Sequence, residues 1–238
     1  MNIAIDCGNT RFKTATFLGN LLEEKNTFSN EAELKNFLNH QPFDCAIVSS
    51  VSVDGQEILS WVNTTKRLLL THTLPLPIHI EYKTPATLGV DRIAAVCGAL
   101  DIFPEREVLV IDAGTCITYD FLDRHKKYFG GAIAPGIGMR FEALHTFTKR
   151  LPLVQATATA ALIGDSTESS IRSGVLNGAI AEMEGIIKKY KNLYPEVGVV
   201  LCGGDTLFFE NNLKPPIFAA PDLVLSGLNR IMLHHASL

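Results

Sequence analysis

Apolar and polar residues alternate along the first part of the chain, as they do in β-strands that bury one face. Ile3 and Ile5 share one face of a predicted strand, and Ala15 and Phe17 share one face of a second. Gly8-Asn9-Thr10 lies between the two strands and has the composition of a turn. The chain is therefore predicted to open with a β-hairpin.

Helical and strand patterns then alternate. Residues 30–38 have the spacing of an amphipathic helix with Asn30 as its N-cap, and residues 44–50 form an apolar run typical of a buried strand. The proline-rich segment 74–77 predicts an extended link. An apolar helix is expected over residues 92–100, and Pro104 ends it.

The pattern of residues 2–10 returns at residues 108–115. Each segment is an apolar strand that ends in Asp-x-Gly followed by an amide or hydroxyl side chain. A second hairpin follows, with strands at 116–122 and 127–134. This repetition predicts a chain built from two related halves.

The remainder of the second half contains two helices and a strand. Asp165 followed by Glu168 suggests a capping-box-like start for a long helix that runs to about residue 192. Residues 197–202 predict a core strand, and residues 223–234 a C-terminal helix.

The repeat divides the chain into two predicted domains, residues 1–105 and 106–238, with the last helix able to pack back on the first half. The chain has 238 residues, of which 47% are apolar and 19% charged, as expected for a compact globular protein. The net charge is −4 with both signs interspersed, which argues against nucleic acid as the main partner.

No apolar stretch is long enough to span a bilayer, and the first residues lack the pattern of a signal peptide. We therefore expect a cytoplasmic protein without a membrane partner.

The five cysteines include no Cys-x-x-Cys pair, which argues against a zinc site. Cys7 and Cys116, inside Gly-rich turns, are interpreted as small fillers rather than nucleophiles.

A carboxylate at the end of a buried strand, followed by a glycine turn, suits a magnesium ion and a phosphate. Asp6 can hold magnesium directly or through water, while Asn9, Thr10 and Lys13 can donate to phosphate oxygens. A single Asp-x-Gly turn is more often an ordinary hairpin turn. Two copies, with Asp112 in the second, favour a nucleotide triphosphate held from both sides.

Gly203-Gly204-Asp205 follows the predicted last strand, where backbone without side chains can lie against an adenosine. With the two Asp-x-Gly turns it gives a three-part nucleotide site. This combination resembles the superfamily of acetate and sugar kinases, actin and heat-shock chaperones. The resemblance implies an α/β fold of two duplicated ribonuclease H-like (actin-like ATPase) halves with a nucleotide cleft between them.

A narrower resemblance rests on five motifs distributed over nearly the whole chain. They are DCGNTRFK at 6–13, GVDR at 89–92, DAGTCIT at 112–118, GGAIAPG at 130–136 and GDST at 164–167. With Tyr82 ahead of GVDR, they make the chain similar to type III pantothenate kinases. The resemblance implies ATP-dependent phosphorylation of the primary hydroxyl of pantothenate to 4′-phosphopantothenate, the first step of coenzyme A biosynthesis, with magnesium and a monovalent cation, potassium or ammonium.

The resemblance also implies roles for individual residues. Asp91 would be the general base, although it could also be the N-cap of the helix that begins at Arg92. Asp112 would hold the monovalent cation. The expected nucleotide-binding residues are Asp6, Cys7, Gly8, Asn9, Thr10, Arg11, Phe12, Lys13 and Thr115. The expected substrate-binding residues are Tyr82, Gly89, Val90, Asp91, Arg92 and Thr167.

Some alternatives stay open from the sequence. Arg92 could pair with the substrate carboxylate or the migrating phosphoryl group, or form a surface ion pair. The small residues Gly174, Gly178, Ala179 and Ala181 could pack within the monomer or against a second copy. The resemblance favours a homodimer.

Three other functions compete with this interpretation. One is a non-catalytic regulatory or accessory protein of the same fold, and another is a kinase for a different small hydroxylated or acyl substrate. A dinucleotide-dependent oxidoreductase is excluded because no Gly-x-Gly-x-x-Gly follows the first strand.

Overall fold

The computed structural model describes residues 1–214 and 216–237, and its chain groups into two compact units. The first unit comprises Met1–Glu105, Phe121–Gly130 and Asp222–Leu238, and the second comprises Arg106–Asp120 and Gly131–Pro221. The predicted division into domains 1–105 and 106–238 stays a prediction, and its residues 215 and 238 lie outside the described residues.

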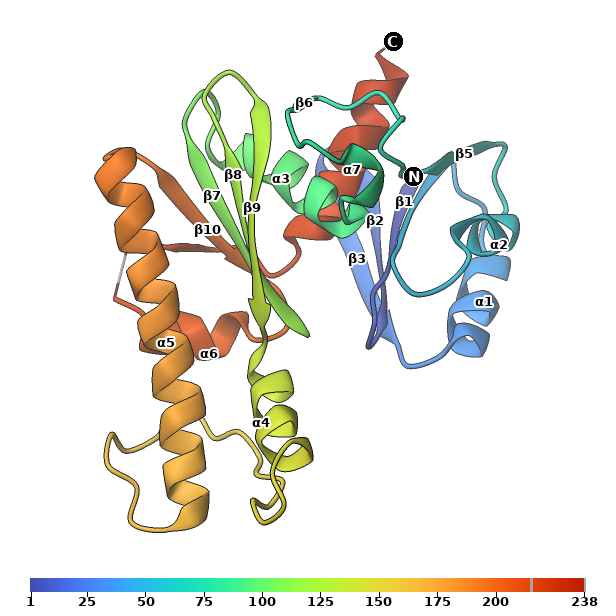
Figure 1. Cartoon of the computed structure of the whole chain (residues 1–238). Helices are drawn as coiled ribbons and strands as arrows, with labels where there is room; N and C mark the ends of the chain where they lie inside the picture. The colour runs from blue at the N-terminus through green and yellow to red at the C-terminus, as the bar shows by residue number, and fades with distance from the viewer. Residues whose placement is uncertain (215, 238) are drawn as a thin grey trace. The chain divides into compact units, whose positions relative to one another are not determined.

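The first unit holds a five-stranded sheet with four α-helices and a short 3₁₀ helix (Figure 1). Its elements are β1 (Asn2–Cys7), β2 (Phe12–Leu18), β3 (Leu21–Phe28), α1 (Glu31–Asn39), β4 (Cys45–Ser50), α2 (Gly55–Ser60), β5 (Lys66–Leu69), β6 (His79–Ile80), η1 (Pro85–Thr87), α3 (Val90–Ile102) and α7 (Leu223–Ala236). The short strand β6 pairs with β9, described below, and not with the five-stranded sheet.

The sheet order is β3-β2-β1-β4-β5, which places β1 at the centre. The predicted opening hairpin is confirmed, because β1 and β2 pair antiparallel from Asn2↔Phe17 to Cys7↔Phe12. The predicted cap of α1 is confirmed as well, since the Asn30 side chain accepts a hydrogen bond from the Glu33 amide at 3.0 Å. β3 was not predicted from the sequence.

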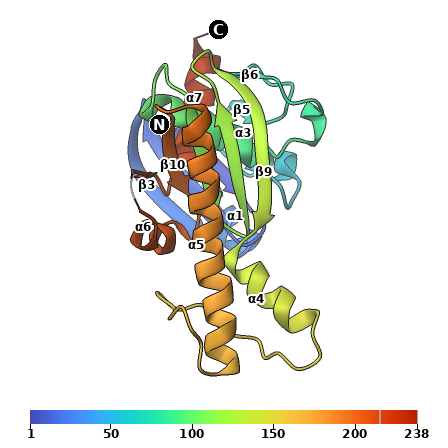
Figure 2. The same cartoon turned by 60° about the vertical axis from the view of Figure 1, so that its left-hand side comes forward.

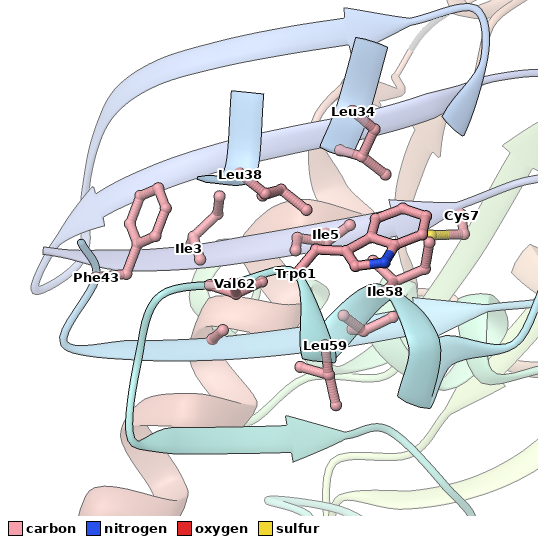
Figure 3. Close-up of a cluster of buried hydrophobic side chains, with 12 residues drawn as sticks. Ile3, Ile5, Cys7, Leu34, Leu38, Phe43, Ile58, Leu59, Trp61 and Val62 are labelled. Atoms are coloured by element: carbon pink, nitrogen blue, oxygen red, sulfur yellow. The ribbon is translucent and has the colours of Figure 1, made fainter. Parts of the chain in front are cut away.

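Helices α1 and α2 cover one face of this sheet through an apolar core (Figure 3). Ile3, Ile5 and Cys7 of β1 meet Leu34 of α1 and Ile58 of α2, and each of these side chains is at most 1% exposed. Trp61 closes the cluster next to α2. Burial of these side chains supplies the main driving force that holds the helices on the sheet.

Helices α3 and α7 pack together, and α7 also contacts β1, β2 and β4. Their backbones touch at two glycines: a Cβ on Gly98 would lie 2.5 Å from the Leu223 carbonyl oxygen, and one on Gly227 1.8 Å from that of Ala94. Asn229 of α7 donates to the Gly19 carbonyl at 2.9 Å. The C-terminal helix therefore belongs to the core of the first unit.

The second sheet has the order β11-β10-β7-β8-β9-β6. The further elements are β7 (Val108–Ala113), β8 (Cys116–Leu122), β9 (Lys127–Pro135), α4 (Ile137–Thr146), α5 (Thr167–Leu193), β10 (Gly198–Cys202), α6 (Thr206–Asn212) and β11 (Phe218–Ala219). Reading β9-β8-β7-β10-β11 reproduces the order β3-β2-β1-β4-β5, with β7 in the place of β1. The predicted α/β fold of two duplicated halves is confirmed by this shared topology.

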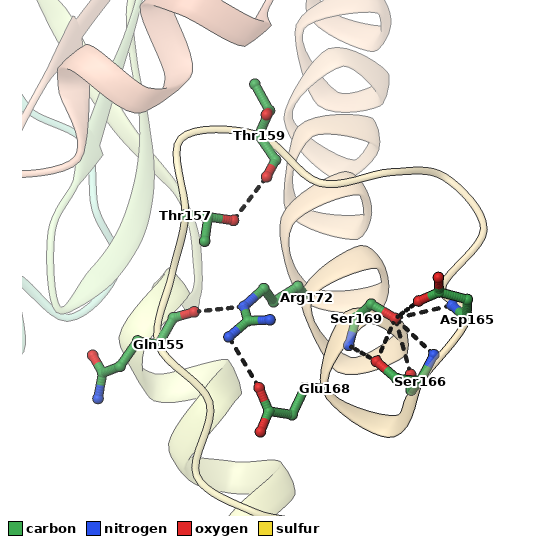
Figure 4. Close-up of polar contacts among 8 residues, drawn as sticks. All are labelled: Gln155, Thr157, Thr159, Asp165, Ser166, Glu168, Ser169 and Arg172. Carbon is green, nitrogen blue, oxygen red and sulfur yellow. Dashed lines mark hydrogen bonds and ion pairs between the residues drawn. The ribbon is translucent and has the colours of Figure 1, made fainter.

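Helix α5 is the longest helix, and α4 lies beside its N-terminal part (Figure 2). The predicted capping box at Asp165 and Glu168 is wrong by one residue. Ser166 is the N-cap, and its reciprocal partner is Ser169, because a serine hydroxyl can both donate and accept (Figure 4). Across the described part of the chain, no helix combines the length and apolar character that crossing a membrane requires.

Ile5→Ala should lower the free energy of unfolding by about 2–5 kcal/mol, because it leaves a cavity in the core beneath α1 and α2. Leu18→Ala is the matched control, since Leu18 is 66% exposed, and it should change stability by less than about 0.5 kcal/mol. Urea unfolding followed by the fluorescence of the single tryptophan, Trp61, measures both. Equal losses in the two variants would contradict the position of this core.

Candidate active site

The first Asp-x-Gly turn joins β1 to β2. Asp6 is half-buried near the end of β1, and the Gly8 amide donates to the Arg11 carbonyl at 3.2 Å to close the turn. Ser52 fixes the turn from the other side by donating to the Gly8 carbonyl at 3.0 Å. Asn9 and Thr10 are exposed at its tip, where their side chains are accessible to a phosphate.

Three polar side chains lie in a row on neighbouring strands at this turn. Asp6 is paired with Lys13 of β2 and with Ser49 of β4, and residues in register share one face of a sheet. The Ser49 hydroxyl is fully buried and has no hydrogen-bond partner among the described residues. A carboxylate between an ammonium group and a hydroxyl can hold a hydrated cation and a phosphate together. The sequence predicted Asp6 and Lys13 as site residues, but it did not point to Ser49.

Cys7 is fully buried and belongs to the apolar core beside this turn. Burial, with Asp6 and then Glu31 nearby, raises the pKa of the Cys7 thiol to about 12. A thiol with this pKa stays protonated near neutral pH. The structure thus agrees with the interpretation of Cys7 as a small filler.

The second Asp-x-Gly turn meets the Gly203-Gly204-Asp205 turn at the ends of two adjacent parallel strands. Asp112 of β7 is in register with Cys202 of β10, and the Asp205 amide donates to the Ala113 carbonyl at 2.8 Å. Gly203 has φ +97°, and a Cβ on it would lie 2.4 Å from Oδ1 of Asp112. Only glycine allows this approach, so two predicted elements of the nucleotide site are neighbours.

The GGAIAPG motif reaches the same place from β9. The Gly136 amide donates to the Thr115 carbonyl at 3.1 Å, and a Cβ on Gly136 would lie 2.2 Å from the Gly114 carbonyl oxygen. Thr115 itself is exposed. The turns at Gly136 and Gly203 therefore both adjoin the main chain of Ala113, Gly114 and Thr115, directly after Asp112.

Arg140 holds the start of α4 to this arrangement. Its Nε donates to the Pro135 carbonyl at 2.9 Å, and its Nη2 donates to Oε2 of Glu182 in α5 at 2.8 Å. The Tyr119 hydroxyl approaches Oε1 of Glu182 at 3.5 Å, and burial first, with Glu182 second, raises the pKa of Tyr119. Sequence reasoning missed this network because its members are far apart along the chain.

Asp91 and Arg92 lie at the start of α3. The helix begins at Val90 with Gly89 as N-cap, so the alternative in which Asp91 caps a helix from Arg92 is wrong. Asp91 instead folds back over the helix end, where its Oδ1 accepts from the Arg92 amide at 2.8 Å. The helix N-terminus favours the negative charge of this carboxylate. Arg92 is 8% exposed, which excludes a surface ion pair.

Thr167 is the first residue of α5 and lines a cavity of about 660 Å³. The cavity is bounded by apolar side chains of α4 and the following loop and by the polar start of α5; its lining is Leu144, Leu151, Gly164, Asp165, Ser166, Thr167, Ser170, Ile171 and Gly174. Figure 4 shows Ser169 and Arg172 tying the preceding loop to the helix. A partly apolar hollow with hydroxyl groups at one end suits a small polar organic molecule.

The candidate residues divide between the two units. Asp6, Lys13, Tyr82 and Asp91 belong to the first unit. Asp112 and Thr115, with Thr167, belong to the second. Among the described residues, no cluster of three His, Cys, Asp or Glu side chains could hold a metal ion.

Comparison with known proteins agrees with these motifs. The sequence model of the family described as type III pantothenate kinase matches residues 2–189. The chain is 46% identical over 237 residues to a type III pantothenate kinase of Bacteroides fragilis, covering 98% of this chain and 97% of that protein.

Two solved structures show the same fold. One is a putative Baf family transcriptional activator from Campylobacter jejuni, with a TM-score of 0.68 and 22% identity over 99% of this chain and 100% of that chain. The other is a putative 2-dehydro-3-deoxygalactonokinase from Sinorhizobium meliloti, with a TM-score of 0.58 and 15% identity over the full length of both.

Gly203→Ala should lower the free energy of unfolding by about 1–3 kcal/mol, because the added Cβ meets the Ala113 carbonyl and Asp112 at a φ that only glycine adopts readily. Gly204→Ala, where nothing lies within 4 Å of an added Cβ, should cost much less. Urea unfolding of both variants checks the difference. Equal stability would mean that the two turns are not in contact.

Proposed function

The chain belongs to the type III pantothenate kinase family and phosphorylates pantothenate with ATP in the first step of coenzyme A biosynthesis, and we propose that Asp91 is the general base of this reaction. The observation that carries the proposal is the Asp91 carboxylate at the N-terminus of α3, held by the Arg92 amide at 2.8 Å. Phosphoryl transfer requires a group that orients the attacking hydroxyl and accepts its proton.

In this proposal the Asp91 carboxylate accepts the proton of the primary hydroxyl of pantothenate as its oxygen attacks the γ-phosphorus of ATP. The bond from that phosphorus to the bridging oxygen breaks, and ADP leaves. Fixing Asp91 by a backbone hydrogen bond lowers the reorganisation that the reaction needs. Arg92, buried beside it, supplies positive charge for the substrate carboxylate or for the phosphoryl group.

Residues 6–13 are proposed to hold the phosphates of ATP and a magnesium ion. The row Lys13, Asp6 and Ser49 fits a phosphate with its magnesium ion, because the Asp6 carboxylate can hold the hydrated ion while the Lys13 ammonium group donates to a phosphate oxygen. When bound, magnesium would neutralise charge that develops on the phosphates. The amide of Asn9 and the hydroxyl of Thr10 would donate to phosphate oxygens from the tip of the turn.

Asp112 is proposed to hold the monovalent cation, potassium or ammonium, with Thr115 contacting phosphate. The observation that fits is the close approach of Gly203 and Gly114 to Oδ1 of Asp112: an added Cβ would lie 2.4 and 3.5 Å from it, respectively. A carboxylate surrounded by backbone carbonyls is a suitable ligand set for a large monovalent ion.

Tyr82 and Thr167 are proposed to contact pantothenate. Tyr82 offers an aromatic wall with a hydroxyl, and Thr167 a hydroxyl at a helix N-terminus that lines the cavity. The cavity of about 660 Å³ lies within the size range of small-molecule sites.

We also place the enzyme in the cytoplasm, where ATP and reduced thiols are found.

A homodimer is proposed from one face of α5. Gly174, Gly178 and Gly185 have nothing within 4 Å of an added Cβ, so they do not mediate close packing inside the monomer. Leu162 and Ile163 are 81% and 85% exposed on the loop tied to α5 by the Ser173 hydroxyl. Small and exposed apolar residues together fit the surface of a second copy.

Asp91→Asn should reduce pantothenate-dependent turnover by at least about 100-fold while leaving ATP binding intact, because the amide cannot accept the proton. ADP release with ATP, magnesium, potassium and pantothenate measures turnover, and a reaction without pantothenate gives the background. Asp101→Asn, at the far end of α3, is the control.

If the unmodified protein binds ATP but ignores pantothenate, the substrate assignment fails. An Asp91→Asn variant with ordinary turnover would leave the assignment of pantothenate as substrate intact and show that Asp91 is not the general base.

Gly178→Arg should convert a dimer to a monomer, because the arginine has room in the monomer but would collide with a second copy. Asn192→Arg, near the exposed end of α5, is the matched control. Sedimentation at several protein concentrations measures the mass. A monomeric unmodified protein, or a Gly178→Arg variant that remains dimeric, would contradict an interface at this face.

A further inference from the structure

The segment that carries Tyr82 is attached to the edge of β9. β6 pairs with β9 in parallel through His79↔Lys127 and Ile80↔Tyr128. The His79 amide donates to the Lys126 carbonyl at 2.8 Å, and the Glu81 amide donates to the Tyr128 carbonyl at 2.9 Å. The backbone is thus fixed up to the residue before Tyr82.

The ring of Tyr82 lies directly against the backbone of Gly130. A Cβ on Gly130 would lie 2.5 Å from both Cδ2 and Cε2 of Tyr82, closer than real Cβ atoms approach other atoms. Gly130 is buried and Tyr82 half-buried, so the ring covers the glycine. The position of the half-buried Tyr82 ring therefore depends on Gly130 having no side chain.

The conformation of Gly130 does not by itself explain the contact. Gly130 has φ +88°, which favours glycine in any surroundings. Gly19 also has a positive φ, +61°, yet nothing lies within 4 Å of a Cβ added there. Gly19 therefore shows what a purely conformational glycine looks like in this chain, and the close approach of Tyr82 is an additional property of Gly130.

A Cβ at residue 130 would move the ring more readily than the strand. β9 is held by its hydrogen bonds to neighbouring strands, whereas a tyrosine side chain rotates about χ1 and χ2 at low cost. The ring would leave its place while the sheet stayed intact. The expected consequence is a change in what Tyr82 contacts rather than a loss of fold.

We propose that Gly130 is a positioning residue that sets the ring of Tyr82 for binding of the pantothenate acceptor. The inference rests on the proposed function, in which Tyr82 forms a wall of the acceptor site. It adds that the first glycine of the GGAIAPG motif acts on the acceptor, through Tyr82, and not on the nucleotide. Substitutions at residue 130 thereby change the affinity for pantothenate, although residue 130 does not itself contact pantothenate.

The experiment compares Gly130→Ala with Gly19→Ala in steady-state kinetics with pantothenate and ATP varied separately. Gly130→Ala should raise the KM for pantothenate by roughly tenfold and leave the KM for ATP within about twofold, since only acceptor contacts are lost. Gly19→Ala carries the same kind of backbone strain without the contact, and it should leave both KM values unchanged. Equal kinetics in the two variants would overturn the proposal.

A double-mutant cycle with Tyr82→Ala tests whether Gly130 acts through the ring. Tyr82→Ala alone should raise the KM for pantothenate, and adding Gly130→Ala should raise it no further, because the ring that the Cβ displaces is gone. If the two substitutions instead multiplied their effects on the KM for pantothenate, Gly130 would act independently of Tyr82, and the proposal would be overturned. A Tyr82→Ala variant with an unchanged KM would also overturn it.

Two outcomes separate this inference from the proposed function. If Gly130→Ala alone does not fold but the double variant does, the collision is confirmed, and the comparison of Tyr82→Ala with the double variant still tests the effect on KM. Absence of pantothenate-dependent turnover in the unmodified protein would contradict the proposed function itself. An active Gly130→Ala variant with an unchanged KM for pantothenate would contradict only the role of Gly130.

Discussion

The close approach of backbone segments at the carboxyl ends of the central strands is the constraint on which the site depends. The last residue but one of β1 and of β7 is an aspartate, and each strand is paired in parallel with a neighbour whose end lies beside that aspartate. Beside Asp6 this neighbour is the small side chain of Ser49, and Asp112 is approached by the main chain of Gly203 and Gly114. Side chains of ordinary size at Gly203 or Gly114 would crowd the Asp112 carboxylate.

The same requirement explains how the C-terminal helix comes to cover the first sheet. α3 and α7 cross where Gly98 and Gly227 bring the two backbones into contact, and the pair covers the face of the sheet opposite α1 and α2. Asp6 points away from the apolar core that Ile5 and Cys7 enter, because alternate residues of a strand face opposite sides. The face that carries Asp6 is thus the face that α3, with Asp91 at its start, helps to cover.

Much of the fold could be predicted from the sequence, because period and turn composition are local properties. The opening hairpin, the Asn30 cap and the repeated Asp-x-Gly strands all depend on neighbouring residues. β3 escaped prediction because most of Leu21–Phe28 is exposed on both faces, so no alternation marks it as a strand. The cap of α5 was misplaced at Asp165, since Asp and Ser are equally good N-caps and only the backbone geometry chooses Ser166.

The parts of the site that escaped prediction are contacts between distant segments. Ser49 is adjacent to Asp6 only because β4 pairs with β1, and Arg140 meets Glu182 only because α4 lies beside α5. The contact between Tyr82 and Gly130 has the same origin, since it depends on the pairing of β6 with β9, which are far apart along the chain. The expected roles of Tyr82 and Asp91 rest on the motif resemblance, because local residue patterns do not predict them.

The two halves share a topology but end their second parallel strands differently, and this difference has a chemical meaning. In the first half β4 leads into Ser50-Val51-Ser52, where the Ser52 hydroxyl binds the Cys7 and Gly8 carbonyls and closes the turn. In the second half β10 leads into Gly203-Gly204-Asp205, with a positive φ and little side-chain cover. The adenosine position expected from the sequence beside Gly203-Gly204-Asp205 rests on this glycine backbone, which has no counterpart in the serine-closed turn of the first half. The duplication thus supplies two similar aspartate turns, and the halves diverge at the neighbouring strand end: Ser52 closes the turn in the first half, whereas Gly203 and Gly204 bring no side chains in the second.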